Sequence, residues 1–125
     1  MKYYILLTVL LFSTNAYSIE ITKEAINEMC ILNYDIYNGC YASAKDLKPV
    51  SNAGCVDVTK SASGAIRGLT EDVFKTMKWD TTNEETFAPI LAHKDDVCMD
   101  ACSVYLKKKK IKTRSKYIAD CVKNY

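Results

Sequence analysis

The sequence predicts a small all-α protein: a disulfide-stapled bundle of four helices, or five if the second helix breaks, after a cleaved signal peptide. Three observations lead to this fold class. The chain opens with an export signal, six cysteines follow that signal, and apolar residues then recur at three- and four-residue steps. An exported chain enters an oxidising compartment, so an even number of cysteines indicates disulfide bonds rather than metal ligands or reactive thiols.

Residues 1–18 have the three parts of a signal peptide. Lys2 supplies a positive charge, an apolar run of ten residues covers 3–12, and small residues lead up to Ser18. The apolar run is much shorter than the roughly 20 residues that span a bilayer. We therefore expect cleavage after Ser18, one domain over 19–125, and localisation in a bacterial periplasm or outside the cell.

Two helices are expected in the first half of this domain. The first starts at the N-cap Thr22 and ends at Lys48, since a residue before proline avoids helical angles. Its apolar face holds Ile26, Cys30, Tyr34, Tyr37, Cys40, Tyr41 and Ala44. The second helix starts at Ser51 or Asn52, and a break near Gly68 would make two helices of it. Its apolar face holds Cys55, Val58, Ala62, Ile66, Leu69, Val73 and Met77.

Two further helices are expected in the second half. Thr82 and Glu85 match a capping box, which predicts the start of a third helix. Its apolar face holds Phe87, Leu91, Cys98, Cys102 and Tyr105. A fourth helix is expected from about Thr113 to Lys123, with an apolar face made of Tyr117, Ile118, Cys121 and Val122.

Six cysteines allow 15 connectivities, among which helical register favours one. A hairpin of the third and fourth helices would pair Cys102 with Cys121, because the two lie at similar distances from the turn. Cys40 and Cys55 flank the turn at Pro49 in the same way. The remaining pair would be Cys30 with Cys98. We expect this set of three bonds.

The third helix also offers metal and catalytic alternatives. Cys98 and Cys102 have the spacing of two zinc ligands, but His93 lies on the opposite helical face and export favours oxidised sulfur. His93, the only histidine, shares a face with Asp96 and Asp100, an arrangement that suits a general base or a cation. That face is expected to be solvated. We expect no metal, no cofactor and no catalytic residue.

The charges are unevenly distributed, with an acidic body followed by a basic C-terminal segment. Residues 19–106 hold 8 Lys/Arg against 14 Asp/Glu, a net charge of −6, and residues 107–125 hold 8 Lys/Arg against one acid, a net charge of +7. Seven of these cations form a basic run between 107 and 116. They are Lys107, Lys108, Lys109, Lys110, Lys112, Arg114 and Lys116. Such a run suits an anionic surface or an acidic protein, or is a solvated turn between helices. Nucleic acid is not expected as a target outside the cell.

These features favour a protein that acts by binding another protein, such as an inhibitor or immunity protein of a partner enzyme. The alternative is a secreted carrier of a small apolar ligand or lipid, and the third hypothesis is an enzyme that uses His93. The sequence contains no G-x-S-x-G, P-loop, G-x-G-x-x-G or H-E-x-x-H motif. We expect no membrane span after the signal peptide and a protein partner at the basic run.

Overall fold

A computed structural model describes residues 21–125 and confirms the all-α class. Within that range the chain forms four helices and no strand. They are α2 (Lys23–Leu47), α3 (Asn52–Thr76), α4 (Glu84–Leu106) and α5 (Arg114–Lys123). The predicted signal peptide lies outside the described residues.

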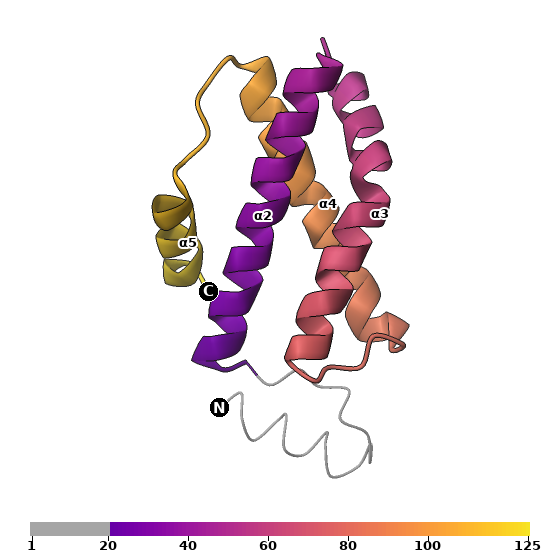
Figure 1. The fold of residues 1–125 in the computed structure, drawn as a ribbon, viewed down its shortest axis with the longest axis vertical. Coiled ribbons are helices and arrows are strands. Elements are labelled where there is room, and N and C mark those ends of the chain that lie inside the picture. Colours follow the sequence, from indigo (N-terminus) through magenta and orange to yellow (C-terminus); the bar gives the residue numbers. More distant parts are fainter. Residues whose placement is uncertain (1–20) are drawn as a thin grey trace.

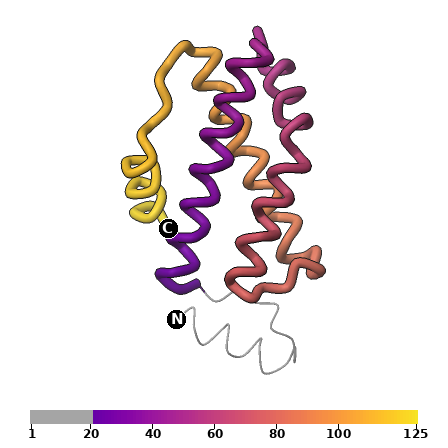
Figure 2. The backbone as a smooth tube through the Cα atoms, in the orientation of Figure 1, coloured from indigo at the N-terminus to yellow at the C-terminus, as the bar shows by residue number. Residues whose placement is uncertain are grey.

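Three long helices make the core of the bundle, and a short one covers its side. α2 and α3 are antiparallel neighbours, and α4 packs against both of them (Figure 1). The backbone then crosses the end of the bundle and runs back beside α2, where α5 lies on the side away from α3 (Figure 2). The described part of the chain is therefore a three-helix bundle with α5 attached to α2.

Local capping signals placed most helix starts correctly. Side-chain oxygens of Thr22, Ser51 and Thr113 accept a hydrogen bond from a backbone N–H inside the first turn of α2, α3 and α5. Thr22 was the predicted N-cap of α2, and the other two helices begin next to the residues where they were expected to start. The predicted start of α4 is wrong by one residue, because Asn83 caps this helix through the Glu85 N–H at 3.1 Å. Thr82 instead bonds to the Asp80 carboxylate with its own N–H and hydroxyl.

The expected break of the second helix does not occur. α3 is continuous through Gly68, because buried residues on both sides hold the helix against the core. Thr70 is fully buried and donates its hydroxyl to the Ile66 carbonyl oxygen at 2.7 Å. Leu69, expected on the buried face, is 39% exposed, and the buried face continues through Phe74 instead.

None of the three expected disulfides is present. The structure pairs Cys30 with Cys121, Cys40 with Cys98, and Cys55 with Cys102, instead of Cys30–Cys98, Cys40–Cys55 and Cys102–Cys121. The expected pairing of Cys40 with Cys55 treated α2 and α3 as an isolated hairpin. In the folded chain both cysteines bond to α4, because α4 packs against both helices.

The position of α5 explains the other two errors. The linker between α4 and α5 contains an extended stretch from 109 to 113, so α5 does not fold back on α4 as a tight hairpin (Figure 1). α5 packs on α2 instead, where the ring of Tyr117 lies 5.7 Å from that of Tyr34 and 4.8 Å from that of Tyr37. Cys121 consequently bonds to Cys30 on α2.

Removing the Cys30–Cys121 bond should loosen α5 and leave the three-helix core intact. In a variant with both residues changed to Ser, we expect the amide hydrogens of α5 to lose their protection in hydrogen exchange. Amides of α2, α3 and α4 should lose less protection than those of α5, because Cys40–Cys98 and Cys55–Cys102 still hold these three helices together.

The matched control changes Cys55 and Cys102 to Ser, which removes a bond that closes a shorter loop but links α3 to α4. In the chain-entropy model both bonds constrain the unfolded chain by about 4 to 5 kcal/mol. The control should therefore also lose stability, with α3 rather than α5 losing protection. Unchanged exchange of the α5 amides in the first variant would show that the aromatic contacts alone hold α5.

Candidate functional site

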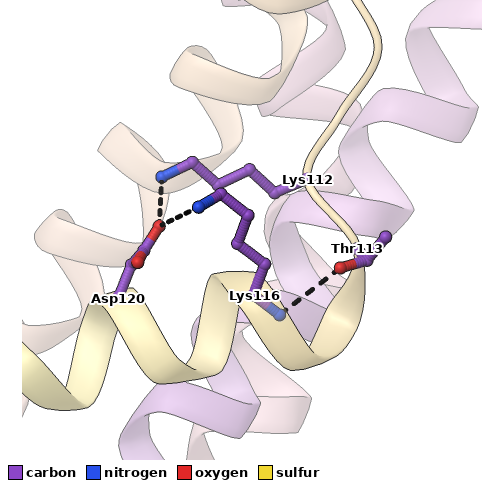
Figure 3. A network of polar contacts seen from close by, with 4 residues as sticks. All are labelled: Lys112, Thr113, Lys116 and Asp120. Atoms are coloured by element: carbon purple, nitrogen blue, oxygen red, sulfur yellow. Dashed lines mark hydrogen bonds and ion pairs between the residues drawn. The ribbon is translucent and has the colours of Figure 1, made fainter.

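The predicted basic run separates into two parts in the folded chain. Lys107 to Lys110 are exposed at the end of the bundle where α4 stops, and none of them forms an ion pair with residues 21–125. Lys112 and Lys116 lie further along and both reach the carboxylate of Asp120, at 2.9 and 3.9 Å (Figure 3). Arg114 is exposed, and it too forms no ion pair in the described part of the chain.

The backbone holds the first part of the run in place. Lys108 adopts left-handed angles, with φ of 56°, and so turns the chain out of α4. The N–H of Lys109 then donates to the Val104 carbonyl oxygen, and the Tyr41 hydroxyl donates to the Lys109 carbonyl oxygen at 3.3 Å. The four consecutive lysines are therefore presented from a linker that is anchored to α2.

The same end of the bundle carries two more lysines, at the C-terminus of α2. Lys45 lies 5.9 Å from the ring centre of Tyr41, and Lys48 caps α2 with a left-handed φ of 53°. We call Lys45, Lys48, Lys107, Lys108, Lys109 and Lys110 together the basic end. Lys45 and Lys48 could not be assigned to this surface from the sequence, because only the parallel course of α2 and α4 brings them beside the basic run (Figure 1).

Exposed aliphatic side chains accompany these lysines. Leu47 at the end of α2 is 59% exposed, and Val50 in the turn before α3 is 93% exposed. Close by, the partly buried Leu106 at the end of α4 packs against the hydrophobic cluster that contains Ala44 and Cys55. The basic end thus combines positive charge with exposed apolar side chains.

A groove is the second candidate site. It lies between α4 and α5 and is also lined by residues of α2. Its volume is about 620 Å³, within the range of small-molecule sites. Its apolar walls are formed by Met29, Pro89, Ile90, Val97, Tyr117 and Tyr125. Its polar lining consists of Asn33, His93, Lys94, Asp100, Lys112, Asp120, Cys121 and Asn124.

A buried lysine lines this groove. Lys94 is 1% exposed, and its Nζ donates to the Asn33 Oδ1 atom at 2.6 Å. Burial lowers the pKa of Lys94 to about 8, because the charged form has lost its hydration. The burial of Lys94 could have been predicted from its spacing in the sequence. It precedes Cys98 and Cys102 at four-residue steps, which places it on the core face of α4.

His93 lies at the same groove but has no catalytic partner there. Its side chain is exposed, and it forms no hydrogen bond or ion pair with the described residues. Partial burial, and then the neighbouring Lys94 charge, lower the pKa of His93. Asp96 and Asp100 are exposed as well, in agreement with the expected solvated face.

Metal binding finds no support in the described part of the chain. Cys98 and Cys102, which have the spacing of zinc ligands, are both in disulfides. No group of three or more His, Cys, Asp or Glu side chains among residues 21–125 is arranged to hold a metal ion.

Comparison with known proteins gives no relative. No protein-family model matches the chain, and neither a curated protein nor a solved structure is significantly similar to it. Among the described helices, none is both long enough and apolar enough to cross a membrane.

The buried amine of Lys94 predicts a rise in stability between pH 7 and pH 10. The pKa of Lys94 is about 8 in the folded protein and 10.5 in the ordinary case, so the unfolded chain binds more protons between these values. The free energy of unfolding should therefore increase by about 2 kcal/mol across this range. Urea denaturation at several pH values measures it.

A Lys94→Met variant should lack this increase, because it has no amine to deprotonate. Lys75→Met is the matched control, since it removes an exposed lysine on α3 and should keep the increase. Burial raises the pKa of Tyr117 to about 12, so towards pH 10 the unfolded chain loses a proton that the folded protein keeps, which lowers the stability of the wild type and of both variants alike. An equal pH dependence of the wild type and Lys94→Met would show that Lys94 is solvated.

Proposed function

We propose that this protein is an exported binding protein rather than an enzyme, and that it acts by docking its basic end on an acidic protein. An inhibitor or immunity protein that occludes a partner enzyme would work in this way. The observation that carries the proposal is the grouping of Lys107 to Lys110 with the exposed Leu47 and Val50 at one end of the bundle.

Charge at the basic end is available to a partner. The four consecutive lysines have no acidic partner within residues 21–125, whereas Lys112 and Lys116 are already engaged by Asp120. Asp46 is the one acidic residue of the last α2 turn, so the basic end retains a strong positive excess. A partner with an acidic patch would be attracted over about a Debye length, roughly 8 Å at physiological salt.

Apolar area at the basic end supports a protein partner. Leu47 and Val50 offer exposed side chains that gain from leaving water, which charge alone does not provide. Leu47 ends α2, which Cys40–Cys98 joins to α4, and Val50 precedes α3, which Cys55–Cys102 joins to the same helix, so disulfides hold both helix ends in place. A rigid surface costs less conformational entropy on association than a mobile one. The three disulfides also fit an oxidising compartment, such as a bacterial periplasm or the extracellular space.

Removing charge from the basic end should slow association with the partner. In a variant with Lys107, Lys108 and Lys110 changed to Gln, we expect the association rate constant to fall about tenfold at low salt and to approach the wild-type value at high salt. The dissociation rate should change much less. Surface plasmon resonance with the partner captured by the wild-type protein measures both rates.

The matched control changes Lys23, Lys75 and Lys78 to Gln, which removes the same charge at the opposite end of the bundle. This control should associate like the wild type, and both variants should keep their stability within about 0.5 kcal/mol. Equal association rates of the two variants at low salt would contradict docking through the basic end. Lysine-dependent binding to anionic lipid vesicles, with partner capture unaffected, would assign the basic end to a membrane surface instead.

A further inference from the structure

The groove between α4 and α5 contains a buried charge with an incomplete set of partners. Lys94 is 1% exposed and has three N–H donors when protonated, of which Asn33 takes one. No carboxylate among residues 21–125 forms an ion pair with Lys94. A buried ammonium without an opposite charge is costly, so this position gains from an anion that enters the groove.

Asn33 fixes the amine at the wall of the groove. Its Oδ1 atom accepts from Lys94, and its Nδ2 group donates to the Cys121 sulfur at 3.8 Å. Cys121 is in turn bonded to Cys30 on α2. The amine is thus positioned by groups from α2 and α5, and a ligand would find it already oriented.

The other charges of the groove do not neutralise Lys94. Asp120 is engaged by Lys112 at 2.9 Å, and Asp100 is exposed on the next turns of α4. Burial and the neighbouring Lys94 charge lower the pKa of His93, which favours its neutral form over a second cation beside Lys94. Lys94 is the one buried charge on the part of the groove that the structure describes.

The walls beside this amine are apolar. Met29 and Val97 come from the core of the bundle, and Ile90 lies one turn before Lys94 on α4. A ligand with both a negative group and a hydrocarbon part matches this lining. Asp100 also borders the groove and forms no ion pair with residues 21–125, so it would repel a dianion more than a single charge. This favours a carboxylate over a phosphate.

We propose that the groove between α4 and α5 binds a small amphipathic carboxylate. Its carboxylate accepts hydrogen bonds from Lys94 Nζ, and its hydrocarbon part packs against Met29, Ile90 and Val97. The site is separate from the basic end and goes beyond the function proposed above.

Calorimetric titration of the full chain with octanoate and with 1-octanol tests this site, because the two probes share a hydrocarbon chain and differ in charge. The wild type should bind octanoate about tenfold more tightly than 1-octanol, or better, since a hydrogen bond to a charged group contributes this much. Lys94→Met should bind both probes equally. The control Lys75→Met should retain the wild-type preference.

Several results would overturn the proposal: no octanoate binding by the wild type, equal affinity for both probes, or an undiminished preference in Lys94→Met. Inorganic phosphate that competes with octanoate at similar concentrations would assign the site to phosphate anions.

If Lys94→Met does not fold, NMR of the isotope-labelled wild type gives the answer. Octanoate should then shift the Cε signal of Lys94 and leave that of Lys75 in place. A Lys94 signal that does not move at saturating octanoate would refute the site.

Discussion

One turn of α4 determines how the whole bundle is assembled. Cys98 bonds to α2 and Cys102, four residues later, bonds to α3, so a single helical face is covalently fixed to two different helices. Each disulfide also fixes the height at which its two helices meet. The basic end depends on this constraint, because it consists of the ends of α2 and α4 held at the same level.

The same face of α4 connects the core to the groove. One turn before Cys98 it carries Lys94, whose burial follows from its position in line with the two cysteines. A lysine at a core position is destabilising unless its amine finds partners, and Asn33 supplies only one. A purely structural role at this position would need no charge. The buried charge of Lys94 is therefore the physical reason for proposing that it binds a ligand.

Features that depend on neighbouring residues could be predicted from the sequence. The N-cap Thr22 and the starts of α3 and α5 were predicted correctly, because these signals involve the first turn of each helix alone. The cysteine pairs were wrong because pairing depends on which helices touch, and the hydrophobic pattern does not encode this. α4 packs against both α2 and α3, and α5 packs on α2 rather than on α4, so symmetry about a turn was a poor guide. For the candidate sites, the lysines at 107 to 110 were found because they are consecutive, whereas Lys45 and Lys48 join them only in three dimensions.

The pairing has a consequence for how the chain matures. Every disulfide joins one of the first three cysteines, Cys30, Cys40 and Cys55, to one of the last three, Cys98, Cys102 and Cys121. A chain that emerges N-terminus first presents the first three to an oxidant before any of their proper partners exists. Bonds made at that stage are all non-native and must be exchanged by thiolate attack once α4 arrives. The native pairing is therefore favoured when oxidation is delayed until the chain is almost complete, or when the thiolates of Cys98, Cys102 and Cys121 are free to exchange an early bond.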